Sequence, residues 1–366
     1  MAELTTDDTT LPLIADPANY LACQWDLCEL PDKRRHWIDV FRRHFPSLLE
    51  QACRVEEHDG KDAADAEQRA TWAKETFFAE LDRMETEPER FTRFDILTIC
   101  YARERVLREA GFDDPYRLAK AKENDAAIKL LPDVLAELDA MDPAERAVAV
   151  VKGMFAGNIF DLGATSTAER FQNEQVDFRA TLAQLPDRPW VVDDLDPWLD
   201  RLRAGEAHER ALMFVDNAGP DVVLGMIPFA RYLLQRGTDV IITANTEPSL
   251  NDVTHDELGE LLEQVAEVDG VIRGAMAAGR LETAPSGNNA PLIDLTRVSP
   301  ELVAKVGEAG VDLLVLEGMG RALESNFFAR FNCETIKVAM IKDRGVAESL
   351  GGELYDVVFR YETPEG

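Results

Sequence analysis

The C-terminal part of the chain alternates short apolar runs with amphipathic segments, and this alternation limits the possible folds more than any other feature. From residue 210 onwards we expect strands at 211–215, 239–244, 312–316, 335–341 and 356–361, and helices at 222–235 and 255–265. The Thr254-x-x-Glu257 pattern is a capping box, and Ser299-Pro300 opens a further helix. Such alternation is typical of an α/β fold, with a mostly parallel sheet covered by helices on both faces in a Rossmann-like three-layer arrangement.

The first part of the chain has a different pattern. Apolar residues recur three and four positions apart in 63–84, 93–110 and 124–141, which predicts helices. Pro186, Pro189 and Pro197 lie where the two patterns meet. We therefore expect three segments: a mainly helical N-terminal region (1–150), a connecting segment that contributes to the site (151–205) and an α/β core (206–366).

The charge composition restricts the possible partners. The chain has 69 acidic and 39 basic residues and a formal net charge of −30. Nucleic acids and anionic membranes attract basic surfaces, so we expect this protein to bind neither. Residues 1–16 lack a basic segment and a long apolar stretch, and no apolar run is long enough to span a bilayer. We expect a cytoplasmic protein and leave its oligomeric state open.

The five cysteines are scattered along the chain. None of them forms a C-x-x-C pair. This spacing argues against a disulfide framework and against a zinc ribbon.

Polar side chains follow the ends of the expected strands. They are Asp216, Asn217, Asn245, Asp252, Glu317, Arg321 and Lys342. Ligands of parallel sheets bind outside the carboxyl ends of the strands. Oxygen donors of this kind suit a hard cation such as Mg²⁺ or Mn²⁺, which would offset the repulsion between an acidic protein and a phosphate ester. The plainer interpretation is that each Asp or Asn only caps a turn or a helix.

Three other motif interpretations fit less well. Gly318-x-Gly320 resembles half of a dinucleotide fingerprint, but Leu323 stands where the third glycine belongs. An aspartyl-phosphate phosphatase usually carries a second Asp two residues after the nucleophile, and Ala218 occupies that place after Asp216. The chain has no P-loop and no G-x-S-x-G motif, which disfavours P-loop NTPases and α/β-hydrolases.

Three ordered segments resemble the DUF89 family of damage-control phosphatases. They are Asp-Asn-Ala-Gly (216–219), Asn-Asp-Val-Thr (251–254) and Glu-Gly-Met-Gly-Arg (317–321), supported by 157–161, 286–288 and 293–299. The similar subfamily contains plant stand-alone members and the C-terminal domain of eukaryotic pantothenate kinases. The resemblance runs from about residue 103 to residue 359, and no pantothenate kinase domain is visible in the sequence.

The resemblance implies a divalent cation held by Asp216, Asn217 and Asp252. Family members use Mn²⁺, Co²⁺, Ni²⁺ or Mg²⁺. It also implies hydrolysis of small phosphorylated metabolites, including 4′-phosphopantetheine and its oxidised or otherwise damaged forms. Other subfamilies act on sugar phosphates, so the substrate stays open.

Our mechanistic hypothesis is an in-line attack on phosphorus by metal-activated water, without a phosphoenzyme. Asp216 and Asp252 are the candidates to orient that water or to accept its proton. Arg321 and Lys342 are expected to stabilise charge on the transferring phosphoryl group. The expected substrate contacts are Asn158, Asp161, Asn245, Glu317, Gly320, Arg321 and Lys342.

Two alternatives of other classes remain. A non-catalytic protein of this fold would bind a phosphorylated metabolite as a regulator, although such proteins are expected to lose a metal ligand. A carboxyl methyltransferase is the second alternative, and no glycine-rich methyl-donor loop supports it.

Overall fold

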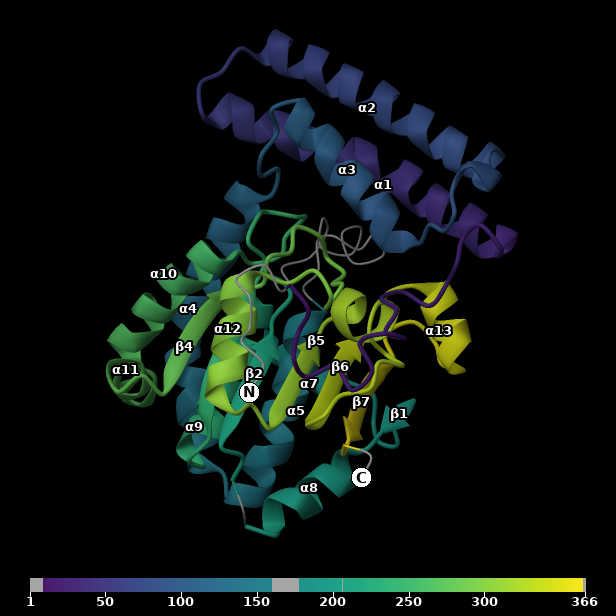
Figure 1. The fold of residues 1–366 in the computed structure, drawn as a ribbon. Helices are drawn as coiled ribbons and strands as arrows, with labels where there is room; N and C mark the ends of the chain where they lie inside the picture. The colour runs from purple at the N-terminus through teal and green to yellow at the C-terminus, as the bar shows by residue number, and fades with distance from the viewer. Residues whose placement is uncertain (1–8, 160–177, 206, 365–366) are drawn as a thin grey trace.

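The computed structural model describes residues 9–159, 178–205 and 207–364, and its centre is a seven-stranded sheet (Figure 1). The strand order is β1-β7-β6-β5-β2-β3-β4, and only β6 and β7 pair antiparallel. The strands are β1 (Val192–Asp193), β2 (Arg210–Phe214), β3 (Asp239–Ala244), β4 (Leu281–Pro285), β5 (Leu313–Glu317), β6 (Glu334–Met340) and β7 (Val357–Glu362). The predicted α/β fold with a mostly parallel sheet is confirmed.

Helices cover both faces of the sheet, and α1–α3 lie across one of its ends (Figure 1). They are α1 (Pro31–His58), α2 (Ala63–Thr86), α3 (Ile96–Glu109), α4 (Arg117–Ala140), α5 (Pro143–Asn158), α7 (Phe178–Gln184), α8 (Leu195–Arg203), α9 (Ile227–Gln235), α10 (His255–Val268), α11 (Gly270–Ala277), α12 (Pro300–Ala309) and α13 (Arg344–Leu350). The capping box of Thr254 and Glu257 opens α10, and the Ser299 side chain caps α12. None of the helices in the described ranges combines the length and apolar character needed to cross a membrane.

Alternate residues of β2 face two different hydrophobic clusters. Leu212 and Phe214 belong to the cluster that also contains residues of α12 and of α1–α3, whereas Ala211 and Met213 belong to the cluster with residues of α4, α5, α8, α9, α10 and α11. This period-two division is what a strand buried on both faces requires. In Figure 1 the α1–α3 layer lies across one end of the α/β body.

Two strands of the sheet, β4 and β1, were not predicted from the sequence. β4 has only two buried residues, Leu281 and Ala284, and lies at the edge of the sheet, so its sequence lacks a continuous apolar run. β1 is two residues long and pairs with β7. The segment boundaries expected near residues 150 and 205 stay a prediction. Helix α5 runs from Pro143 to Asn158, through the first of these boundaries, and its buried residues belong to the same hydrophobic cluster as those of the sheet.

Candidate functional site

The site lies at the carboxyl edge of the sheet, where neighbouring strands end side by side. Phe214 of β2 pairs with Leu316 of β5 on one side and with Thr243 of β3 on the other. Two wide π-helical turns follow β2 and β5 closely: η2 (Asp221–Met226) and η3 (Met319–Glu324). Turns of this type are frequent at functional sites.

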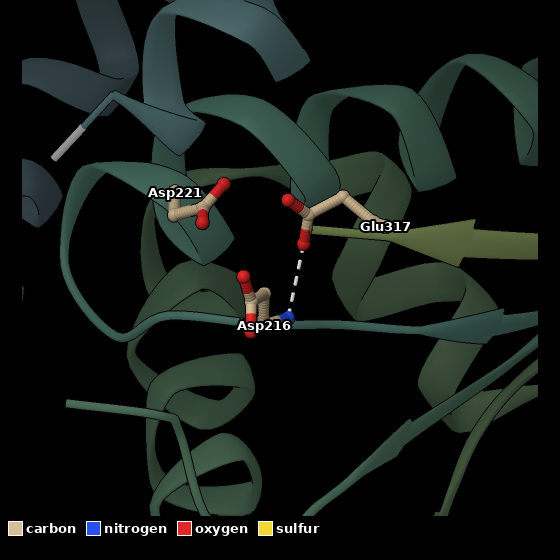
Figure 2. Close-up of side chains that lie close together, drawn as sticks. All are labelled: Asp216, Asp221 and Glu317. Atoms are coloured by element: carbon tan, nitrogen blue, oxygen red, sulfur yellow. Dashed lines mark hydrogen bonds between the residues drawn. The ribbon is translucent and has the colours of Figure 1, made fainter. Parts of the chain in front are cut away.

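Three buried carboxylates converge at this edge: Asp216, Asp221 and Glu317 (Figure 2). Each offers an oxygen within 4.8 Å of the other two. The backbone N–H of Asp216 donates to Glu317 Oε2 at 2.9 Å. From the end of α5, Asn158 Nδ2 donates to Glu317 Oε1 at 2.6 Å and to Asp221 Oδ2 at 3.0 Å. We call Asp216, Asp221 and Glu317 the acid cluster.

The acid cluster concentrates negative charge in a region that excludes water. Burial raises the pKa of Asp221 to about 6, and the charge of Asp216 acts in the same direction. Burial, Asp221 and Asp216 raise the pKa of Glu317 well above its usual value, although Lys342 and Arg321 oppose this. Within the described part of the chain, Asp221 Oδ1 is buried without a hydrogen-bond partner.

A divalent cation fits the acid cluster. Buried charges are stable only when they are paired or coordinate a metal, and Asp221 Oδ1 has no partner among the residues that the structure describes. All the donor atoms are oxygens, which hard cations prefer. The acid cluster can therefore hold a metal ion.

Arg321 joins two of the carboxylates that the sequence singled out. The Arg321 side chain is buried, and its Nη1 donates to Asp216 Oδ1. Its Nη2 donates to Asp252 Oδ2 at 2.8 Å and to Asn245 Oδ1 at 3.0 Å. Asn245 Nδ2 also donates to Asp252 Oδ2, at 2.9 Å. The structure thus brings Asp216, Asn245, Asp252 and Arg321 into one hydrogen-bonded group.

The expected metal ligands divide between these two groups. Asp216 belongs to both, whereas Asp252 lies on the Arg321 side. Asn217 Nδ2 donates to Asp216 Oδ2 at 3.2 Å and to Asp221 Oδ2 at 2.8 Å. Sequence reasoning missed Asp221, because an acid after Pro220 at the start of a helix has the pattern of an ordinary helix terminus.

Two glycines permit the close approach of the segments at this edge. Gly318 has φ +96°, and a side chain there would clash with the carboxylate of Asp216. A side chain at Gly320 would clash with the carbonyl oxygen of Pro291. Gly320 and Lys342 line the same cavity as Asp216. Asp161, an expected substrate contact, lies outside the described residues.

Helices of the N-terminal region hold the loop that carries Asp252. Ser249 Oγ donates to Glu104 Oε1 of α3 at 2.9 Å, and both side chains are buried. Lys120 of α4 is fully buried, with Nζ 2.8 Å from Glu257 Oε1 and 3.5 Å from the Asp252 carbonyl oxygen. The position of Asp252 therefore depends on helices that lie more than a hundred residues earlier in the chain.

A cavity of about 610 Å³ lies between the α1–α3 layer and the strand ends. Asp216, Asn217 and Asp252 line it on the side of the sheet. Arg43 of α1 and Arg344 of α13 are exposed residues that also line it. Their positive charges favour an anion at this cavity, although four carboxylates also line it: Asp216, Asp252, Glu324 and Asp343.

His36 and Asp343 connect α1 to α13 across this cavity, and their contact predicts a dependence of stability on pH. His36 Nε2 lies 2.9 Å from Asp343 Oδ2, and this hydrogen bond raises the pKa of His36 above 6.5. A raised histidine pKa adds stability below the unfolded-state pKa, and that stability is lost as the pH rises through the folded-state pKa. His36→Gln should therefore destabilise the protein more at about pH 5.5 than at about pH 8.5.

Urea denaturation of the wild type and of His36→Gln at the two pH values measures this difference in unfolding free energy. His58→Gln, at the exposed end of the same helix, is the control. An equal loss of unfolding free energy at both pH values would contradict the expected role of the contact.

Comparison with known proteins adds family information to this geometry. The family model described as the damage-control phosphatase ARMT1-like domain matches residues 40–358. A damage-control phosphatase of Arabidopsis thaliana is 42% identical, over 89% of this chain and 87% of the relative. The 4′-phosphopantetheine phosphatase of Mus musculus is 33% identical, over 97% of this chain and 48% of that protein, so this chain spans about half of its length. A DUF89 family protein from Pyrococcus horikoshii shares the fold, with a TM-score of 0.58, 16% identity and coverage of 88% of this chain and 96% of that one.

Proposed function

The chain belongs to the DUF89 family of damage-control phosphatases, and we propose that it is a metal-dependent phosphomonoester hydrolase acting on small phosphorylated metabolites. The observation that carries this proposal is the acid cluster at the carboxyl edge of the sheet. Its member Asp216 also lines the cavity, so a cation in the acid cluster would meet a phosphate that enters there.

The proposed substrate is 4′-phosphopantetheine or one of its oxidised or damaged forms. The support comes from relatives named as a 4′-phosphopantetheine phosphatase and as a damage-control phosphatase. The cavity offers room for an organic group of this size beside the phosphate, since small-molecule sites typically measure roughly 300–1,000 Å³.

In the proposed reaction, residues of the chain hold the phosphate and direct the attacking water. Asp216, with Asp221 and Glu317 or with Asn217 and Asp252, would hold the cation, which supplies a Lewis acid and makes water a stronger nucleophile. Lys342 lines the cavity and offers N–H donors to the phosphate oxygens.

The remaining roles belong to Arg321 and Asp252. Arg321 keeps the carboxylates of Asp216 and Asp252 in fixed positions, and its proposed further role is to stabilise charge on the transferring phosphoryl group. Asp252 is the proposed acceptor of the proton that water loses. Water attacks phosphorus as the bond from phosphorus to the ester oxygen breaks. The leaving alkoxide receives the proton that Asp252 took from the water, so the products are an alcohol and phosphate and Asp252 is ionised again.

Phosphate release across a panel of divalent cations tests the proposal. After treatment with a chelator, the protein should release no phosphate from 4′-phosphopantetheine, and Mn²⁺, Co²⁺, Ni²⁺ or Mg²⁺ should restore release. The assay is colorimetric detection of free phosphate, with sugar phosphates as further substrates.

Two other outcomes would contradict the proposal. Saturable binding of 4′-phosphopantetheine without phosphate release would identify a binding protein. Undiminished release in the presence of excess chelator would contradict the dependence on a metal.

A further inference from the structure

Three apolar side chains of α1 face the cavity. Trp37, Val40 and Phe41 line it, and their spacing of three and four residues places them on one face of the helix. Leu250, Leu292 and Met319, from loops at the strand ends, also line the cavity. The apolar lining therefore comes from the α1–α3 layer and from the strand-end loops, whereas Asp216, Asn217 and Asp252 come from the sheet edge alone.

Several polar side chains of the α1–α3 layer also line the cavity, and they are engaged within the protein. His36 contacts Asp343 at 2.9 Å, and Arg103 donates to Glu104 at 2.6 Å. His44 Nε2 lies 3.5 Å from the hydroxyl of Tyr116. Arg43, which also lines the cavity, is exposed, and its Nε donates to the Asp39 carbonyl oxygen at 3.2 Å. A ligand hydroxyl beside His36, His44 or Arg103 would have to compete for a group that already has a partner, and a buried hydroxyl without a hydrogen bond is costly.

We infer that the α1 face formed by Trp37, Val40 and Phe41 is the specificity wall of the cavity, and that it selects phosphomonoesters whose leaving group is an aliphatic chain over sugar phosphates. This inference rests on the proposed phosphatase function. The wall excludes water from an aliphatic chain, and each buried methylene then improves binding. A sugar places a hydroxyl on nearly every carbon, so the same wall disfavours it.

A series of n-alkyl phosphates tests the wall without changing the reacting bond. Ethyl, butyl and hexyl phosphate are primary esters with nearly the same leaving-group basicity, so differences in kcat/KM report contacts of the chain. We expect kcat/KM to rise by up to about fourfold per buried methylene, which is on the order of a hundredfold from ethyl to hexyl phosphate. Hexyl phosphate should also be preferred over glucose 6-phosphate, whose leaving group has the same number of carbons.

Val40 offers the sharpest variant. It is half-buried and lines the cavity, so the larger side chain in Val40→Trp would fill part of the cavity between the wall and the ligand chain. This variant should lower the ratio of kcat/KM for hexyl over ethyl phosphate by more than about tenfold. Asp39→Trp is the matched control, because Asp39 is an exposed neighbour on the same helix, and it should keep the wild-type ratio. If Val40→Trp does not fold, Val40→Thr keeps the shape of the side chain and should lower the ratio several-fold.

Two results would overturn the inference. One is an unchanged hexyl-to-ethyl ratio in the folded Val40 variants, and the other is a preference for glucose 6-phosphate over hexyl phosphate in the wild type. Failure of the proposed function looks different, because the wild type would then hydrolyse none of these esters with any cation.

Discussion

Asp216→Asn is expected to lower cation-dependent phosphate release by at least about a hundredfold in kcat/KM. Asp216 is the residue shared by the acid cluster and the Arg321 group, so either arrangement of the cation needs its carboxylate. Loss of a cation that supplies several kcal/mol of transition-state stabilisation predicts this size of effect, since about 1.4 kcal/mol corresponds to tenfold in rate.

The activity loss must be separated from unfolding, because the NH₂ group of the new asparagine would lie against hydrogen-bond donors, which destabilises the fold. Asp216 Oδ1 accepts from Arg321 Nη1, and Asp216 Oδ2 accepts from the amides of Asn158 and Asn217. In asparagine an NH₂ group takes the place of one of these oxygens, and it cannot accept a hydrogen bond. Circular dichroism and a thermal melt therefore accompany the assay. Asp125→Asn removes the same charge from the exposed surface of α4 and is the control. An Asp216→Asn protein with at least a tenth of wild-type activity would falsify the central role of this carboxylate.

Asp221→Asn is expected to stabilise the metal-free protein and to remove the stabilisation by added cation. The pKa of Asp221 is raised from 3.8 to about 6, so at neutral pH the folded protein must keep a buried carboxylate ionised against its neighbours. A shift of this size corresponds to a destabilisation of up to about 3 kcal/mol. We expect the variant to recover about 1–2 kcal/mol of unfolding free energy at neutral pH, because the amide itself must also be buried.

The sign of the pH dependence gives a second readout. A carboxyl group with a raised folded-state pKa destabilises the fold above that pKa, and the penalty disappears as the pH falls and the group is protonated. The advantage of Asp221→Asn should therefore be present at about pH 7.5 and lost by about pH 4.

Saturating Mn²⁺ should reverse the order of stability between the two proteins. The wild type gains stability by binding the cation in its folded state, whereas the variant lacks one carboxylate of the acid cluster. Chemical denaturation with and without Mn²⁺ measures both effects, and Asp125→Asn should behave like the wild type. If Asp252→Asn loses the response to Mn²⁺ while Asp221→Asn keeps it, the cation belongs with Asp252 and Asn217 instead of the acid cluster.

These two predictions describe a site whose functional residues destabilise the metal-free fold. Asp216, Asp221 and Glu317 are buried together, although their mutual repulsion opposes folding. Sites of this kind are where a stabilising substitution is expected to remove activity. A cation bound to the acid cluster would relieve the repulsion, and this couples binding to stability.

The sequence by itself determined the class of fold and the edge of the sheet at which the chemistry lies. Apolar runs of strand length, separated by amphipathic helices, leave few arrangements other than a covered parallel sheet. The carboxyl ends of parallel strands lie at one edge, so Asp216, Asn245 and Glu317 were expected at that edge. The strand order of the structure, with β2 between β5 and β3, then makes them neighbours. The direction of β7 was not predictable, because an apolar run specifies burial without specifying which way the strand runs.

Only the tertiary structure decided how these residues are grouped. Asp221 enters the acid cluster because the wide turn η2 begins there, and a local pattern cannot distinguish such a turn from an ordinary helix start. From the end of α5, Asn158 donates to all three members of the acid cluster, which lie about 60 to 160 residues further along the chain. The α1 wall was equally hidden, since Trp37, Val40 and Phe41 would show the same spacing whether they packed into a core or lined a cavity. Spacing determines which side chains share a face, and only the packing of distant segments determines what that face meets.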